Sequence, residues 1–319
     1  MKKRKIKWLY IFCLFLMLLT FQITYNYLKE KALATNNEQF IKYLLQDSNY
    51  HHLYENNTKK MLKKINEYFF NIEKPVSILE NSFGYKMEKN EKLIFNDEYK
   101  PNEKITKYIK DPNPKEIKDP IVYIYNTHQL ENYSSKNLEN YNITPNVMMA
   151  SYLLKENLNK LGIPSIVEES NITEFLRMNN WNYSESYKAS RLYVLDAINK
   201  YDNLKLFIDL HRDSMKKQFT TVTINNKNYA KIIFVVGLEY KNYEKNLNVA
   251  NKINNIVQKQ YPNLSKGIIK KGGKGVDGIY NQDLHEGMIL IECGGYENNI
   301  EEVMNTVNAL SKVIKEYLK

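Results

Sequence analysis

Three short polar segments, each directly after an apolar run, contain residue types that can bind a metal ion and move a proton. The first contains His128 and Glu131, the second His211, and the third Glu292. Neutral imidazole and carboxylate groups are ordinary zinc ligands, and two histidines with one carboxylate leave a fourth position for water. We therefore predict a zinc-dependent hydrolase whose metal ligands are His128, Glu131 and His211.

The remaining carboxylate, Glu292, is predicted to be the catalytic base and not a ligand. It would take a proton from the attacking water and return it to a leaving amine. The third ligand stays open at this point, because Asp213 and Glu174 offer carboxylates as well as Glu131.

Apolar segments of strand length must position these side chains. Residues 121–125, 204–210 and 288–291 are mostly apolar and end where the polar segments begin. In open α/β sheets, functional groups collect at the carboxyl ends of the strands. The sequence therefore predicts that the candidate residues meet at one edge of a sheet.

Strand-like and helix-like segments alternate from residue 121 to the C-terminus, which is typical of an α/β layered domain with a mostly parallel sheet. The other strands are expected at residues 165–167 and in a hairpin of residues 220–224 and 229–236, closed across 225–228. Four helices are expected. The first has its N-cap at Thr144 and Pro145 at its first position and ends near Gly162, and the second has its cap at Ser184 and continues through Ile198. The other two are expected at residues 246–260 and 300–318.

The N-terminus resembles a membrane anchor. Residues 2–7 are mostly Lys and Arg, and residues 8–23 are almost wholly apolar. That run is shorter than the ~20 residues of a spanning helix, but Thr24, Tyr25 and Tyr27 can extend it at the interface. A signal peptide cleaved after Ala34 is the alternative. We expect an uncleaved single-pass anchor with the rest of the chain outside the cytoplasm.

Four regions follow from this organisation. Residues 1–30 are the cytoplasmic tip and transmembrane anchor, and residues 31–96, with helical periodicity, form a small helical extracytoplasmic region. Residues 97–120 are rich in charged residues and proline and are predicted to be a linker. Residues 121–319 form the catalytic domain. The role of residues 31–96 stays open.

Composition excludes several classes of protein. The two cysteines, Cys13 and Cys293, lie too far apart in this organisation to pair, and they are too few for a two-cysteine zinc site. The net charge of +10 comes without a basic run in the body of the chain, so we expect no nucleic-acid partner. A basic surface instead suits an anionic cell-wall polymer or membrane face.

Four segments together resemble the stage II sporulation protein P family: residues 125–133, 209–213, 280–284 and 291–295. The resemblance covers roughly residues 115–318, and the order of anchor, variable region, linker and catalytic domain agrees with it. Cys293 departs from the more usual apolar residue at its position.

The resemblance implies a peptidoglycan hydrolase of spore-forming Gram-positive bacteria that cuts between N-acetylmuramic acid and L-alanine and within peptide cross-links. It implies a fold similar to zinc N-acetylmuramoyl-L-alanine amidases and action at the engulfing membrane, in the septal or intermembrane space, with stage II sporulation proteins D and M. The expected substrate-binding residues are Arg212, Asp213, Asn281 and Arg191.

Two other functions stay open. A zinc carboxypeptidase has a similar order of ligands, and Arg191 and Arg212 are available to bind a terminal carboxylate. A non-catalytic wall-binding scaffold is the third reading, against which the complete set of ligands and base counts. The balance between amidase and endopeptidase cleavage and the oligomeric state also stay open.

Overall fold

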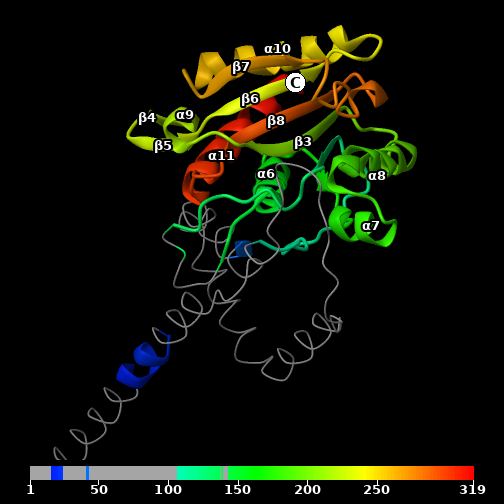
Figure 1. The fold of residues 1–319 in the computed structure, drawn as a ribbon. Coiled ribbons are helices and arrows are strands. Elements are labelled where there is room, and N and C mark those ends of the chain that lie inside the picture. Colours follow the sequence, from blue (N-terminus) through cyan, green and yellow to red (C-terminus); the bar gives the residue numbers. More distant parts are fainter. Residues whose placement is uncertain (1–15, 24–40, 43–105, 137, 139–142) are drawn as a thin grey trace, which may run out of the picture.

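The computed structural model describes residues 16–23, 41–42, 106–136, 138 and 143–319 (Figure 1). Of the expected anchor, residues 16–23 are helical, and the rest of it lies outside the described residues. No helix within the described ranges is both long enough and apolar enough to cross a membrane. Of the expected helical region, residues 41–42 are described, and Ile41 is fully buried in the main core.

A six-stranded sheet forms the centre of the fold. Its strands, in spatial order, are β2 (Ser165–Val167), β1 (Val122–Tyr125), β3 (Leu206–Asp213), β8 (Met288–Gly295), β6 (Ile232–Gly237) and β7 (Ser265–Lys271). The four strands from β2 to β8 are parallel, whereas β6 is antiparallel to β8 and parallel to β7. The protein is therefore a mixed α/β domain with a mostly parallel sheet, as the sequence predicts.

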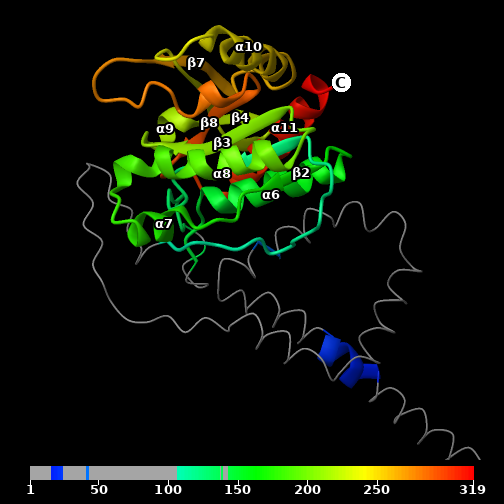
Figure 2. The same cartoon turned by 90° about the vertical axis from the view of Figure 1, so that its right-hand side faces the viewer.

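Helices cover the two faces of this sheet. On one face lie α6 (Val147–Lys160), α10 (Tyr243–Gln260) and α11 (Ile300–Tyr317), whose apolar sides form the main core with the strands. On the other face, α8 (Ser186–Lys200) covers β1 and β3, and α7 (Ile172–Met178) packs against α8. Figure 1 shows α8 and α7 together, away from α10 beside β6 and β7, and Figure 2 shows the same layers from the side.

The strands alternate between these two cores with a period of two residues. Ile124 and Ile208 face the main core, whereas Tyr125 and Phe207 face α8. Both faces are covered, so β1 is buried along its whole length, which explains its continuous apolar run. The same alternation directs the odd-numbered residues at the end of β3 toward the α8 face.

Two predicted helix starts are wrong by a few residues. The N-cap of α6 is Asn146 and not Thr144, because the Asn146 side chain accepts a hydrogen bond from the backbone N–H of Met149. The turn before α8 is a 3₁₀ helix, η2 (Tyr183–Glu185), which is capped by Asn182 and not by Ser184. In both places an asparagine close to the predicted cap takes the cap position.

The predicted hairpin is also shorter than expected. It consists of β4 (Thr221–Ile224) and β5 (Lys227–Ala230), joined through Asn225 and Asn226, which both have positive φ. That backbone matches a tight two-residue hairpin turn, for which asparagine is well suited. The chain then leaves the hairpin at Lys231, and β6 pairs with β8 and β7 instead.

Other elements were not predicted at all. These are α7, the short helix α9 (Lys217–Thr220), β7 and the 3₁₀ helix η3 (Gln282–Leu284). In β7, Gly267 and three lysines interrupt the apolar pattern, as is common at a sheet edge.

Candidate metal centre and active site

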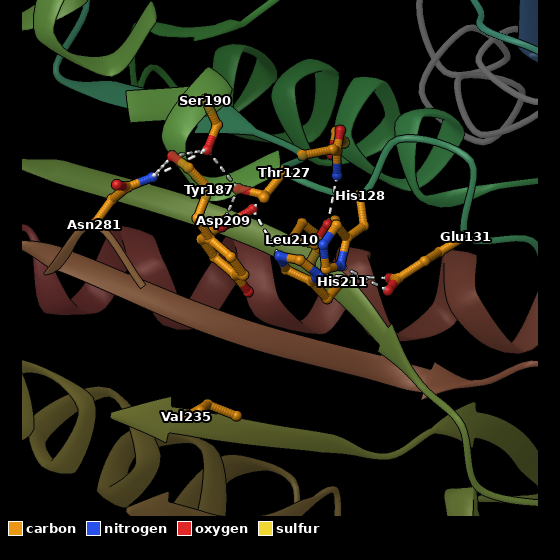
Figure 3. Close-up of polar contacts among 12 residues, drawn as sticks. Thr127, His128, Glu131, Tyr187, Ser190, Asp209, Leu210, His211, Val235 and Asn281 are labelled. Atoms are coloured by element: carbon orange, nitrogen blue, oxygen red, sulfur yellow. Dashed lines mark hydrogen bonds and ion pairs between the residues drawn. The ribbon is translucent and has the colours of Figure 1, made fainter. Parts of the chain in front are cut away.

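The three predicted ligands meet at the carboxyl ends of β1 and β3 (Figure 3). Nδ1 of His128 lies 3.4 Å from Oε1 of Glu131, and Nδ1 of His211 lies 3.5 Å from Oε2 of the same carboxylate. One ligand atom from each residue lies within 4.8 Å of the others. Ligand atoms around a tetrahedral zinc ion, with bonds of about 2.0–2.2 Å, are roughly 3.4 Å apart. The three side chains therefore fit a zinc ion.

The turn after β1 and the backbone of β3 fix Glu131 in this position. The N–H of Glu131 donates to the carbonyl of His128 at 3.2 Å, which brings the two side chains to one side of the turn. Oε2 of Glu131 accepts a hydrogen bond of 2.9 Å from the backbone N–H of Arg212. Burial alone would raise the pKa of Glu131, but the neighbouring His211 imidazole lowers it below its ordinary range. The carboxylate is therefore held ionised, as a ligand must be.

The surroundings of His211 favour a positive charge. Burial by itself would lower the pKa of this imidazole, but the carboxylates of Asp209 and Glu131 raise it well above its ordinary value. Nε2 of His211 lies 2.9 Å from Oδ1 of Asp209, yet it makes no aligned hydrogen bond within the described part of the chain. Two buried carboxylates thus flank one imidazole, an arrangement that a bound cation would balance.

Two tyrosines outside the predicted set of site residues pack on the imidazoles of His128 and His211. The ring of Tyr183 stacks on His128 with centroids 4.5 Å apart, and the ring of Tyr187 lies 5.5 Å from His128 and 6.2 Å from His211. Burial raises the pKa of Tyr187 well above its ordinary value, so its hydroxyl stays protonated. Nothing in the spacing of these tyrosines separates them from the other aromatic residues of the chain.

Glu292 lies beside His211 on the neighbouring strand. The two residues are paired in the register of β3 and β8, so both side chains are on the face covered by α8. Burial raises the pKa of Glu292 to about 7. Its Oε2 is buried and has no hydrogen-bond partner within the described residues. This carboxyl group lies outside the set of three possible ligands and is poised to exchange a proton near neutral pH.

The backbone after Glu292 requires glycine. Gly294 has φ +72°, and a Cβ atom there would lie 2.9 Å from both Ala230 Cβ and Asn298 Oδ1. A side chain at this position would push the end of β8 away from its neighbours. Gly294 therefore permits the close approach of the chain to Ala230 and Asn298.

The alternative carboxylates for the third ligand lie elsewhere. Oδ1 of Asp213 accepts from the N–H of Met215, and a register shift between His211 and Asp213 interrupts the pairing of β3 with β8. Glu174 lies on α7 and pairs with Arg177. Neither joins the two histidines in the group that could hold an ion, so Glu131 is the carboxylate that the structure brings to both imidazoles.

The predicted substrate-binding residues form contacts between elements. Arg212 donates from Nε to the carbonyl of Asn132 at 3.0 Å and from Nη1 to the carbonyl of Asp213 at 3.4 Å. Arg191 donates to both carboxylate oxygens of Asp283, each at 2.7 Å, and so ties α8 to η3. Both guanidinium groups are thus engaged with other parts of the protein.

Asn281 anchors the segment before η3 to the same helix. Its Nδ2 donates to the carbonyl of Tyr187 at 3.1 Å and to Oγ of Ser190 at 3.0 Å. Tyr280 and Asn281 both have positive φ, which is unfavourable for tyrosine and is maintained here by these anchors. The amide of Asn281 is thus engaged with α8.

Comparison with known proteins identifies related sequences. The family model described as stage II sporulation protein P matches residues 34–315 of this chain. Stage II sporulation protein P from Bacillus subtilis (strain 168) is 37% identical over 215 residues, which are 65% of this chain and 53% of that protein. This chain spans about half the length of that curated relative.

Among solved structures, the similarities are remote. The CwlD amidase from Clostridioides difficile, in complex with the GerS lipoprotein, matches 62% of this chain and 98% of its own at 13% identity and a TM-score of 0.39. A metallo-carboxypeptidase from Burkholderia cenocepacia matches 63% of this chain and 57% of its own at 12% identity and a TM-score of 0.37. These TM-scores are too low to support an argument, so the description of the fold relies on the strand order of this structure.

Proposed function

This chain belongs to the stage II sporulation protein P family, and from this premise we propose that it is a zinc-dependent peptidoglycan hydrolase. The bond that we propose it cleaves is the amide between N-acetylmuramic acid and L-alanine, together with stem-peptide cross-links. One observation carries the proposal. His128, Glu131 and His211 offer ligand atoms within 4.8 Å of one another, and the neighbouring strand supplies Glu292 with an unpartnered buried oxygen.

The chemistry assigns Glu292 the proton transfers. Bound zinc would polarise the scissile carbonyl and favour deprotonation of the attacking water. Oε2 of Glu292 accepts the proton of that water and then delivers it to the leaving nitrogen. A carboxyl group with a pKa of about 7 can do both near neutral pH, because neither protonation state is strongly favoured.

Tyr187 supplies a further polar group beside the two imidazoles. The hydroxyl of Tyr187 is protonated at neutral pH because burial raises its pKa, so it is available as a hydrogen-bond donor to the substrate. The protein itself therefore supplies the ligands, the base and a neutral donor on one face of the sheet.

A carboxypeptidase is less well supported. Arginine suits a terminal carboxylate best, because it can form two parallel hydrogen bonds with it. Besides Arg4, the arginines of the sequence are Arg177, Arg191 and Arg212. Arg177 pairs with Glu174, Arg191 with Asp283, and Arg212 donates to two backbone carbonyls. These existing contacts count against binding of a terminal carboxylate by the three arginines.

Digestion of purified peptidoglycan by the full-length protein tests the proposal. An amidase exposes L-alanine amino termini on muramic acid-free peptides, whereas a carboxypeptidase releases single terminal amino acids. We expect new L-alanine amino termini that require zinc and disappear with a chelator. Released terminal amino acids, or an unchanged wall with zinc-loaded protein, would contradict it.

The cellular setting is part of the same proposal. We propose that the N-terminal segment anchors the protein in the membrane, with the catalytic domain in the septal or intermembrane space of a sporulating cell, and that stage II sporulation proteins D and M are its partners. Membership of the family and the apolar run at residues 8–23 support this arrangement. Fractionation of sporulating cells and co-purification with the two partners test it.

A further inference from the structure

A chain of buried polar side chains runs from His211 to the segment that precedes η3 (Figure 3). Oδ1 of Asp209 accepts from the backbone N–H of Thr127 at 2.9 Å, and Oδ2 accepts from the Thr127 hydroxyl at 2.7 Å. That hydroxyl lies 2.9 Å from Oγ of Ser190, which accepts from Nδ2 of Asn281 at 3.0 Å. Four side chains from different parts of the fold are thus connected to one histidine.

The chemistry of the groups fixes the direction of the hydrogen bonds at the two ends of this chain. The ionised carboxylate of Asp209 can only accept, so Thr127 must donate its single hydroxyl hydrogen to it. The amide nitrogen of Asn281 can only donate, so Ser190 accepts from it. The single hydroxyl hydrogen of Ser190 lies within reach of two acceptors, the Thr127 hydroxyl at 2.9 Å and the carbonyl of Tyr187 at 3.2 Å. Asp209 therefore accepts both the backbone N–H and the hydroxyl of Thr127, and neighbouring hydrogen bonds in such a chain polarise one another.

Among the residues that the structure describes, His211 is the cationic partner of Asp209. It is 1% exposed, and the one ion pair that it makes within the described residues is with His211. A buried carboxylate is costly unless it is paired and hydrogen-bonded. Its three contacts, two from Thr127 and one with His211, therefore indicate that its role concerns the imidazole.

The two ring nitrogens of His211 face different carboxylates. Asp209 and His211 are two residues apart on β3, so their side chains lie on the same face of the sheet. Nε2 lies 2.9 Å from Asp209, and Nδ1 lies 3.5 Å from Glu131. A neutral imidazole has one N–H and one lone pair. An acceptor beside Nε2 places the hydrogen there and leaves the lone pair on Nδ1, where the other candidate ligands gather.

We propose that Asp209 is a positioning residue that fixes which nitrogen of His211 binds the metal, and that Thr127, Ser190 and Asn281 hold Asp209 for this purpose. The inference rests on the proposed function as a zinc hydrolase. Nε2 lies close to Asp209 without an aligned hydrogen bond, so a small rotation of the ring on metal binding completes the contact. Asn281, which the sequence predicts to bind substrate, thereby contributes to the metal centre through Ser190, Thr127 and Asp209.

Zinc affinity of the full-length protein, measured by competition with a chromophoric chelator, tests this role. Carboxylates that orient a metal-bound histidine contribute about 10–100-fold to metal affinity. We expect Asp209→Asn to weaken zinc binding by that factor, because an amide does not enforce the tautomer. Asp202→Asn is the matched control, since Asp202 is an exposed turn residue, and it should bind zinc as the parent does.

Thr127 provides a second pair of variants at one position. Thr127→Val removes the hydroxyl but keeps the shape and should weaken zinc binding severalfold, whereas Thr127→Ser keeps the hydroxyl and should restore it. Cobalt(II) in place of zinc adds a spectroscopic measurement, because its visible absorption reports ligand geometry. We expect an altered cobalt spectrum in Asp209→Asn and Thr127→Val and the parent spectrum in Thr127→Ser.

The outcomes separate this inference from the proposed function. If the parent protein binds no zinc, the proposed function fails. If the parent binds zinc and the Asp209→Asn and Thr127→Val variants match its affinity and cobalt spectrum, the positioning role is refuted and the hydrolase proposal stands. If Asp209→Asn does not fold, the Thr127 pair decides, and equal affinity of its two members refutes the role.

Discussion

Replacing Glu292 by glutamine should slow hydrolysis strongly and at the same time stabilise the metal-free protein at alkaline pH. Removal of a general base lowers the rate by about 10²–10⁴-fold. The stability effect arises because the carboxylate is buried and one of its oxygens has no hydrogen-bond partner among the described residues. A residue that burial keeps poised for proton transfer is expected to lower the free energy of unfolding.

The pKa gives the size of this effect. Burial raises the pKa of Glu292 from 4.5 to about 7 in the folded protein. The folded state therefore binds a proton more tightly than the unfolded chain. Its penalty is absent below pH 4.5, grows as the pH rises, and is complete above pH 7. At ~1.4 kcal/mol for each pH unit, ionisation costs the folded state roughly 3 kcal/mol at pH 8.

Urea unfolding of chelator-treated protein at pH 8 and pH 4.5 measures it. Burial of the amide in Glu292→Gln also costs free energy, because the amide leaves its hydrogen bonds with water, but that cost does not depend on pH. The stability of the variant relative to the parent should therefore increase by about 3 kcal/mol from pH 4.5 to pH 8. Glu301→Gln is the matched control, because Glu301 is exposed in the first turn of α11, and it should show no such increase.

A relative stability that is the same at both pH values would refute the reasoning, since it would mean that Glu292 ionises as freely in the folded protein as in the unfolded chain. Hydrolysis at the parent rate by Glu292→Gln would remove the residue from catalysis whatever its pKa.

Three further expectations concern the ligands, the N-terminus and a histidine outside the site. His128→Ala and His211→Ala should each lose bound zinc and hydrolysis while circular dichroism stays unchanged, and full metal content in either variant would exclude that residue as a ligand. A protein that starts at residue 35 should still cleave isolated wall in vitro, and a folded but inactive product would mean that the first 34 residues take part in the reaction. Burial lowers the pKa of His285, so the unfolded chain binds the proton more readily and stability falls as the pH drops below about 6.5. His285→Asn should lose less stability than the parent between pH 7.5 and 5.5, and an equal loss on urea unfolding would contradict this.

The position of the site could be predicted because it depends on a general property of parallel strands. His128, His211 and Glu292 each follow an apolar run, and parallel strands in one sheet deliver such residues to the same edge. The direct pairing of His211 with Glu292 could not be predicted, because it depends on strand order. The sequence does not reveal that β8 pairs with β3, or that β6 enters the sheet in the opposite direction.

The third ligand shows a second limit of sequence reasoning. Asp213 has the same strand parity as His211, so a regular strand would direct both side chains to one face. The register shift after His211 breaks this pattern, and Asp213 instead accepts from the backbone N–H of Met215. A one-residue irregularity in a strand is invisible in the sequence, yet it decides which carboxylate can reach the two imidazoles.

The segment at residues 280–284 shows that the sequence can place residues near the site without revealing what they do there. Its polar side chains suggest substrate binding when only the sequence is considered, because polar residues in a loop are usually available to a ligand. In the structure, Gln282 binds the N–H of Gly237 and the carbonyl of Val235, and Asp283 binds Arg191. These contacts maintain the unfavourable backbone of Tyr280 and connect β6 to α8, which carries Ser190. Residues that hold a metal ligand in place need the same polarity as residues that hold a substrate, so sequence alone cannot separate the two roles, and the measurement that can do so is metal affinity.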